Sequence, residues 1–324
     1  MERSIDFSRM RYMLCKRCGH QWVVDLDWIE RWDQAQESCP TCGVTCEAED
    51  GPRLTVDPAD PALVAEVSRL AWYHTSTQAD WPTTNFHPAA KLTERTKLMM
   101  GGDKPVAEWA ERQRSKALHV GTYEAAVHNM LRRIDDEGDR GKQFYLYRVH
   151  LRLTVIVREG WLIDPSNFVG DVALNEICPP GIDVSRYLNH HEDPGGISLA
   201  LGRPAIDYIQ QLEIPALDAA DANWVAYAVT ALESATASAL SPTGRREFKK
   251  RNTPTPGSKR AFKIPTPLTA GLPVNLRFPF RAAISFNDTM EPGAWARYAA
   301  GLLNVFLAPE QLLAKMNSQS PLHL

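Results

Sequence analysis

The sequence lacks any long apolar run. None of its hydrophobic stretches approaches the roughly 18 residues that a membrane-spanning helix needs, and the opening segment MERSIDFSRMRYMLCKRCGH contains no apolar core of a secretory signal. We therefore expect a cytoplasmic protein with no membrane partner.

Several nucleotide-binding and catalytic signatures are also missing. The sequence contains no phosphate loop, no glycine fingerprint of a dinucleotide-binding fold, no nucleophile-elbow motif and no internal repeat. It has no large net charge either, since 36 basic and 39 acidic side chains leave a net charge of −3. Any binding to nucleic acid must therefore depend on a local basic patch.

Cysteine occurs in a distinctive pattern. Four of the six cysteines form two CxxC pairs, CKRCGH and CPTCG, and a glycine follows the second cysteine of each pair. Two thiolates from each of two tight turns suit the tetrahedral coordination of zinc, and glycine relieves the backbone of the turn. The sequence predicts a structural zinc in a zinc ribbon, bound by Cys15, Cys18, Cys39 and Cys42.

The competing interpretation of these pairs is a redox dithiol, and His20 and Cys46 are spare ligands. A site with four thiolates has no open coordination position, so we do not expect the metal to be catalytic. Cys46 and Cys178 are otherwise expected to be inert, because free cysteine usually behaves as a small buried hydrophobe. The segment QWVVDLDWIERW is expected to supply the sheet of the ribbon. Acidic side chains weigh against phosphate contact on at least one of its faces, namely Asp25, Asp27, Glu30 and Asp33.

The length of 324 residues suits two or three domains. We predict an α+β fold with a zinc ribbon at 1–55, a mixed domain at 60–216 and a helical C-terminal region at 217–324. The acidic, proline-marked stretch at 47–61 is expected to be a linker and helix entry.

Local patterns predict the main elements. A helix is expected around Leu63, Val67, Leu70 and Ala71, and ALHVGT at 117–122 is expected to be a strand that runs into a helix. The alternation over 144–157 predicts a strand with one buried and one polar face. Shorter strands are expected at 171–177, 196–200 and 208–214. Helices are expected at 217–240, with Asp218 or Asp221 at its N-terminus, and at 293–306 and 309–316.

Three polar motifs in the middle region occur in an informative order. The first is WYHTS, which contains His74, and the second is LHVGT, which contains His119 and precedes a helix with Ala125 and Ala126. The third is RYLNHHEDPG, which contains Glu192 and precedes ISL. This order resembles the ADP-ribosyltransferase superfamily, in the branch with a histidine on its first core strand.

The resemblance implies NAD as substrate, bound in the cleft of a split sheet. His74 would bond the nicotinamide ribose, and Glu192 would be the catalytic glutamate, with Glu176 and Glu213 as alternatives. The family's tyrosine on the helix after the second strand is not at its usual place, because Tyr123 is earlier and His128 is nearer to that position. The remaining cofactor-binding residues implied by the resemblance are Thr75, Ser76, His119, Thr122 and Tyr123.

These residue types suit the cleavage of an N-glycosidic bond. The reaction passes through an oxocarbenium-like state, which a nearby carboxylate stabilises. The same carboxylate can accept the proton of the nucleophile, and a neutral histidine can orient a ribose hydroxyl. The ordinary interpretation of each motif alone is structural, with Thr122 as a helix cap and Glu192 as a solvated charge. A second metal at His190 and His191 is disfavoured, because adjacent residues of an extended segment point to opposite sides.

A basic segment lies between Arg245 and Lys263. Its prolines and glycines predict an extended, mobile chain, and Phe248 and Phe262 are interleaved with the charges. Basic side chains can follow a phosphate backbone while rings stack on bases, which predicts a nucleic-acid partner; the ordinary alternative is a solvated linker. The predicted contacts are Arg245, Arg246, Lys249, Lys250, Arg251, Lys259, Arg260 and Lys263.

Two functions follow from these observations. The first is NAD-dependent ADP-ribosyl transfer to a macromolecular acceptor, either DNA or RNA or otherwise protein. The second is a non-enzymatic module in which the zinc ribbon and the basic segment bind nucleic acid or protein. Transfer of an RNA 2′-phosphate to NAD, another reaction of the superfamily, would need additional basic residues around the phosphate, and residues 60–216 show no convincing set.

Overall fold

A computed structural model describes residues 1–64, 66–83, 85–136, 138–164, 172–239, 256–265, 268–286 and 289–324. The fold is mixed α+β, as predicted. The chain forms two compact units, the first from residues 1–126, 147–211 and 320–324 and the second from 127–146 and 212–319. The predicted domain limits stay a prediction. No helix among the described residues is long and apolar enough to cross a membrane.

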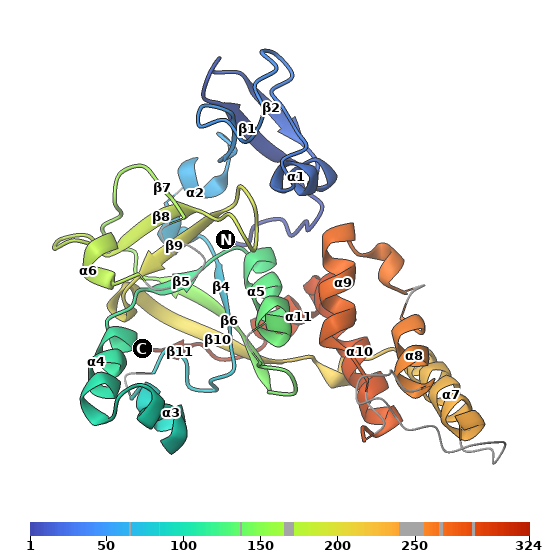
Figure 1. Cartoon of the computed structure of the whole chain (residues 1–324). Helices are drawn as coiled ribbons and strands as arrows, with labels where there is room; N and C mark the ends of the chain where they lie inside the picture. The colour runs from blue at the N-terminus through green and yellow to red at the C-terminus, as the bar shows by residue number, and fades with distance from the viewer. Residues whose placement is uncertain are drawn as a thin grey trace. The chain divides into compact units, whose positions relative to one another are not determined.

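The N-terminal ribbon contains a three-stranded sheet and one helix (Figure 1). Its central strand β1 (Arg11–Cys15) pairs antiparallel with β2 (Gln21–Val24) and with β3 (Pro52–Thr55). The helix α1 (Leu26–Asp33) occupies a segment that we expected to be sheet. It forms because the Asp25 carboxylate caps its first turn by accepting from the Trp28 N–H at 2.8 Å. The strand β3 lies in the predicted linker, so that expectation is also wrong.

Two four-stranded sheets follow, with strand orders β11-β10-β6-β4 and β5-β9-β8-β7. They meet where Tyr73 of β4 and Gly121, just after β5, exchange two backbone hydrogen bonds of 2.9 Å. The first sheet contains β4 (Trp72–Ser76), β6 (Phe144–Leu151), β10 (Ile206–Ile214) and β11 (Leu322–His323). The second contains β5 (Leu118–Val120), β7 (Leu162–Ile163), β8 (Val184–Leu188) and β9 (Ile197–Leu201).

The strand β6 differs from its predicted form. It ends at Leu151, and Leu153 beyond it is 77% exposed. Both of its faces are largely buried, so the predicted alternation of buried and polar residues is absent. The strand lies inside its sheet between β10 and β4. Arg148 on the predicted polar face is buried and donates to the Gln210 side chain at 2.8 Å and to the Glu2 carboxylate at 2.8 Å.

Other expectations for the first unit have mixed outcomes. The strands expected at 196–200 and 208–214 are present as β9 and β10, and the strand at 117–122 runs from β5 into helix α5 (Tyr123–Asp136). The helix expected from Leu63 is two short pieces, α2 (Pro61–Val64) and a 3₁₀ turn at Val67–Arg69. The strand expected at 171–177 is wrong, because α6 (Leu174–Ile177) occupies its second half. The remaining helices are α3 (Glu94–Met99) and α4 (Asp103–Arg114).

The second unit is mainly helical. Helix α7 (Ala222–Ala239) is capped by Asp221, whose carboxylate accepts from the Asn223 and Trp224 N–H groups at 2.8 and 3.0 Å. The predicted C-terminal pair is present as α10 (Pro292–Leu307) and α11 (Pro309–Asn317). The unit also contains α8 (Pro256–Lys263) and α9 (Val274–Ala283).

The basic segment is therefore partly helical. Lys259, Arg260 and Lys263 lie on α8, so the expectation of an extended chain is wrong for this part. The predicted contacts that lie outside the described residues are Arg245, Arg246, Lys249, Lys250 and Arg251.

Candidate functional site

The four cysteines of the two CxxC pairs lie together. All their sulfur atoms are within 4.8 Å of one another. The Sγ–Sγ distances are 3.7 Å between Cys15 and Cys42 and 3.6 Å between Cys18 and Cys39. A tetrahedral ion with metal–sulfur bonds of about 2.3 Å needs sulfur–sulfur separations of about 3.8 Å. The cluster therefore has the dimensions of a four-thiolate metal site and can hold a metal ion.

The two turns that carry the cysteines have the same backbone structure. In the first, the Gly19 N–H donates to the Cys15 carbonyl at 2.9 Å, and in the second the Gly43 N–H donates to the Cys39 carbonyl at 2.9 Å. Both glycines have positive φ, +72° and +68°, a conformation that glycine adopts without steric cost. The Thr41 N–H also donates to the Cys39 sulfur at 3.4 Å, a contact that favours the thiolate form of this cysteine.

The other cysteines and His20 lie outside this cluster. The His20 ring stacks on Trp22 with a centroid distance of 5.4 Å. Cys178 is buried, and its thiol faces Ser185 Oγ at 3.6 Å and the Ala200 carbonyl at 3.5 Å. Burial raises the pKa of Cys178, which favours the unreactive thiol.

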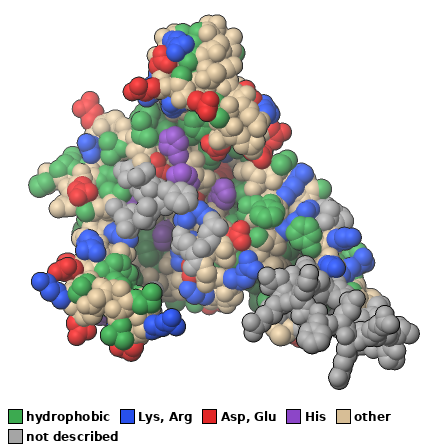
Figure 2. Space-filling view, in the orientation of Figure 1, with side chains coloured by type: hydrophobic (Ala, Val, Ile, Leu, Met, Phe, Trp, Pro, Cys, Tyr) green, Lys and Arg blue, Asp and Glu red, His purple; other side chains and the backbone are tan. Residues whose placement is uncertain are grey.

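The predicted histidines are close neighbours at the junction of the two sheets. His74 Nδ1 is 2.9 Å from the carbonyl oxygen of His119, although the two residues are 45 positions apart. His119 Nδ1 is in turn 3.0 Å from the hydroxyl of Tyr187 on β8. Figure 2 shows histidine side chains gathered in the middle of one face of the first unit. The first two motifs of the sequence thus meet in space.

His119 has an unusual polar environment. Its Nε2 atom is buried and has no hydrogen-bond partner among the residues that the structure describes. Burial lowers the pKa of His119, while the charges of Asp164 and Glu192 act in the opposite direction. Burial therefore favours the neutral ring, which can donate or accept a hydrogen bond at Nε2.

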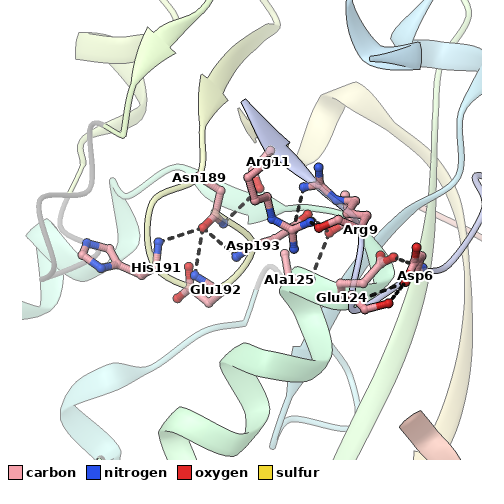
Figure 3. Close-up of polar contacts among 12 residues, drawn as sticks. Asp6, Arg9, Arg11, Glu124, Ala125, Asn189, His191, Glu192 and Asp193 are labelled. Atoms are coloured by element: carbon pink, nitrogen blue, oxygen red, sulfur yellow. Dashed lines mark hydrogen bonds and ion pairs between the residues drawn. The ribbon is translucent and has the colours of Figure 1, made fainter. Parts of the chain in front are cut away.

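Glu192 lies on a tight hairpin between β8 and β9 (Figure 3). The Asn189 side-chain oxygen accepts from three consecutive backbone N–H groups, those of His191, Glu192 and Asp193, at 3.1, 2.9 and 3.1 Å. Burial and the charge of Glu192 both raise the pKa of Tyr187. The hairpin brings the third motif into contact with the second, since the Thr122 hydroxyl donates to the Asp193 carboxylate at 2.8 Å.

Asp193, the next residue, is completely enclosed. It is 1% exposed, and its carboxylate accepts from Arg9 at 2.7 Å, from Arg11 at 3.2 Å and from the Thr122 hydroxyl at 2.8 Å. Burial alone would raise the pKa of Asp193, but the two guanidinium groups and the hydroxyl hold it below its usual value. The buried Glu124 shows the opposite effect, because burial and the nearby Asp193 charge raise its pKa.

The remaining predicted NAD contacts have structural partners. Thr75 is buried and its hydroxyl donates to the Ala126 carbonyl at 2.7 Å, while the Ser76 hydroxyl accepts from the Gln78 N–H at 3.1 Å. Thr122 caps α5, since its hydroxyl accepts from the Ala125 N–H at 2.9 Å. Tyr123 is buried against Tyr73, with a ring distance of 5.4 Å. Their predicted roles as ligand contacts stay predictions.

The structure adds a row of residues that the sequence analysis missed. The Trp81 ring stacks on His74 at 4.2 Å and lies 5.0 Å from the ring of Tyr147. The Tyr147 hydroxyl accepts from the Gln211 side chain at 3.1 Å. Sequence offers no distinctive signal for this row, because Tyr147 and Gln211 lie in strands that contain other aromatic and polar residues.

The alternative glutamates and the extra histidines lie elsewhere. Glu176 is exposed on α6, and Glu213 is exposed in the second unit, where it lines a cavity of about 380 Å³ with Tyr298 and Lys315. His190 and His191 have ring centroids 6.5 Å apart. Within the described ranges, the four cysteines are the only group of three or more metal-ligating side chains with ligand atoms this close together.

Comparison of the chain with protein-family models, with curated proteins and with solved structures finds no match. A functional assignment therefore depends on the geometry of the two sites.

Proposed function

We propose that the protein cleaves NAD and transfers ADP-ribose to a macromolecular acceptor at the site formed by His119, Tyr187 and Glu192. The observation that carries this proposal is the buried His119 Nε2, which has no partner in the described part of the chain. The hairpin of Glu192 meets the segment of His119 where the Thr122 hydroxyl bonds Asp193 at 2.8 Å. Three motifs separated by 45 to 118 positions supply this one neighbourhood, in the order of the ADP-ribosyltransferase resemblance.

The residues divide the reaction between them. His119 Nε2 bonds a ribose hydroxyl. As the bond between ribose C1′ and the nicotinamide nitrogen breaks, its electron pair leaves with neutral nicotinamide. The Glu192 carboxylate stabilises the positive charge that develops on the ribose. The acceptor then bonds to C1′ and gives its proton to Glu192.

His74 has a different role in this proposal from the one implied by the resemblance. Its Nδ1 bonds the His119 carbonyl and its ring stacks on Trp81. We therefore assign the ribose contact to His119, with His74 fixing the position of the β5 backbone.

Release of nicotinamide tests the proposal. Purified metal-loaded protein is incubated with NAD, with and without nucleic acid and a cell-protein acceptor mixture. Glu192→Gln is expected to lower release on the order of a hundredfold or more, and Glu94→Gln, the same change at an exposed carboxylate on α3, to leave it unchanged. If Glu176→Gln or Glu213→Gln loses nicotinamide release instead, the catalytic role belongs to that glutamate. Absence of nicotinamide release with every acceptor would reject the proposal.

The metal of the cysteine cluster is zinc in this proposal, with a structural role. Four thiolates at tetrahedral spacing suit zinc and leave no position open for a substrate. The cluster stabilises a ribbon whose core is too small to fold readily without metal.

A second function, binding of single-stranded nucleic acid, is favoured by the helices α8 and α9. From residue 248 to 287 the sequence has eight basic residues and no acidic one. Phe262 is 52% exposed beside Lys259 and Lys263, and Phe278 on α9 is 69% exposed. The Arg281 guanidinium lies over the Phe262 ring at 5.4 Å. Figure 2 shows basic side chains among apolar ones on this part of the second unit.

Such a surface can follow phosphates while its rings stack on bases. Changing Lys259 and Lys263 to Gln is expected to weaken oligonucleotide binding and to reduce the salt slope by about 0.7 per lost phosphate contact. Binding that is unchanged in this variant, or independent of salt, would reject the surface. Salt-dependent binding without nicotinamide release would favour a non-enzymatic module.

A further inference from the structure

We infer that Asp193 is a positioning residue: it fastens the hairpin that bears Glu192 to the cysteine ribbon, so that metal binding in the ribbon holds the hairpin in place. The role of Glu192 in this inference rests on the proposed function. The mechanical connection does not, because it follows from contacts within the first unit.

The connection begins at the Asp193 carboxylate. One of its oxygens accepts from both Arg9 and Arg11, which come from the start of the ribbon, and the other accepts from Thr122 at the start of α5. Arg11 is 2% exposed and is the first residue of β1. In a water-free setting such charge-assisted bonds are stronger than neutral ones and are costly to break. The hairpin is thus held from two sides by buried contacts.

The backbone of the hairpin also fits closely against the ribbon. Gly195 has φ of +81°, and a Cβ atom there would lie 3.3 Å from the Thr55 carbonyl of β3 and 3.7 Å from Arg11 Cδ. A Cβ atom at Gly196 would overlap the Asp193 carboxylate at 2.3 Å. Glycine at both positions is therefore required for the hairpin to approach the ribbon this closely.

The ribbon end of the connection is continuous with the metal site. The strand β1 has Arg11 at one end and Cys15 at the other. Its partner β3 pairs Thr55 with Tyr12 and Leu54 with Met13, so Arg11 and Thr55, which touch the hairpin, share one small sheet with Cys15 of the cluster. If metal loss unfolds this sheet, Arg11 and Thr55 lose their positions together.

The hairpin end is continuous with the candidate site. Asn189 binds the N–H groups of His191, Glu192 and Asp193 in one cluster, and the Gly195 N–H returns to the Asn189 carbonyl at 3.0 Å. Glu192 is therefore fixed through the same loop as Asp193. Figure 3 shows Arg9 and Arg11 on one side of this loop and Glu192 and His191 on the other.

Hydrogen–deuterium exchange on the full chain tests the inference without any substrate. Removing the metal with a chelator is expected to speed exchange in peptides covering 189–196 by about tenfold or more, the factor that corresponds to loss of one charge-assisted hydrogen bond. Peptides covering β6 are expected to stay unchanged. Faster exchange in the ribbon with no change at 189–196 would overturn the inference.

Two variants separate the link from the metal. Asp193→Asn with metal bound is expected to show the same faster exchange at 189–196 while the metal content stays at wild-type level. Asp50→Asn, which removes an exposed partner of Arg17 next to the metal site, is the matched control and is expected to change neither. Unchanged exchange at 189–196 in Asp193→Asn would also overturn the inference.

The outcome is independent of the proposed reaction. Coupled exchange without nicotinamide release would reject the proposed function and leave the link in place. Nicotinamide release without faster exchange at 189–196 after metal removal would reject the link and support the proposed function. If both hold, Asp193→Asn is expected to lower kcat with little change in KM, because it displaces Glu192 and not the groups that bind NAD.

Discussion

The cysteine cluster and the histidine–carboxylate site, both in the first unit, are built in opposite ways. The cluster takes its ligands from two short turns of the same backbone structure, and each turn is complete within six residues. The histidine–carboxylate site takes His119 from β5, Tyr187 from β8 and Glu192 from the hairpin after it. The first arrangement is local and repeated, whereas the second exists only when β5 and β8, which are distant in sequence, have joined one sheet on either side of β9.

This difference determines what each site depends on. In the ribbon, a metal ion bound by the four cysteines would supply the stability that a small apolar core lacks. In the histidine–carboxylate site, stability comes from the surrounding sheets, which bury ionisable groups such as His119 and Asp193 and satisfy most of their polar atoms. We expect the ribbon to be sensitive to chelation and thiol chemistry, and the second site to be sensitive to pH and to loss of single buried charges.

Metal removal is expected to have the largest effect. Chelation should unfold the ribbon, because its four thiolates would be left close together without a compensating ion. The fluorescence of Trp22, Trp28 and Trp32 is expected to shift to the red, and four additional thiols are expected to react with a thiol reagent. Cys46→Ser is the control and should keep wild-type metal content; a ribbon that keeps its fluorescence after metal loss would contradict the comparison.

Loss of the Asp193 charge is the next largest effect. Asp193→Asn leaves the buried Arg11 and the partly buried Arg9 without their shared carboxylate, which is expected to cost about 3–5 kcal/mol in the free energy of unfolding. Urea titration measures this cost. Because the pKa of Asp193 is lower in the folded state than in the unfolded state, its contribution is present at neutral pH. It is lost as pH falls below the unfolded value of about 3.9. A cost near zero would show that the arginines find other partners.

The dependence on mild acid is expected to come partly from His150. This residue stacks on Tyr208 at 4.3 Å, and burial together with Arg148 lowers its pKa from 6.5 to about 4. Between these two values the unfolded chain binds a proton that the folded chain does not, so stability falls as pH falls from 6.5 to 4. His150→Phe keeps an aromatic ring on Tyr208. In this variant the urea unfolding midpoint is expected to depend less on pH between 6.5 and 4. An unchanged slope would assign the effect to other histidines.

The exposed ion pair of Arg17 with Asp50 is expected to contribute least. Both side chains are about half exposed, 50% and 48%, although their bidentate bonds are 2.8 and 3.0 Å long. Water and salt screen such a pair. Asp50→Asn is expected to leave both the unfolding midpoint and the metal content within error of wild type. A clear loss of metal in this variant would mean that the Arg17–Asp50 pair helps the cluster to hold its metal.

Local features of the fold could be predicted from sequence. The two cysteine turns, the Thr122 helix start and the C-terminal helices follow from spacing, capping and glycine placement within a few residues. The strand β3 could not, because PRLT is a strand only through its pairing with β1. The helix α1 was missed because its aromatic residues also suit a strand.

The candidate site shows the same limit of local information. The resemblance implies that His74, His119 and Glu192 lie near one another. The structure brings the first segment to the second and the second to the third, and the roles of the three residues stay predictions. The resemblance gave no reason to separate Glu192 from Asp193, which are neighbours in a polar loop. The two differ because Arg9 and Arg11, 184 and 182 positions away, enclose only Asp193. The row of Trp81, Tyr147 and Gln211 was missed since it depends on strand order.

The short strand β1 has a consequence for how inactivating substitutions would be interpreted. It joins Cys15 at the metal to Arg11 at the hairpin within five residues. In a saturation scan for loss of function, the four cysteines and the glycines of the hairpin would score alongside Glu192, although none of them touches a substrate. Sensitive positions on such a map would include residues that act on a substrate and residues that only hold those residues in place. Measuring folding alongside activity would separate the two groups.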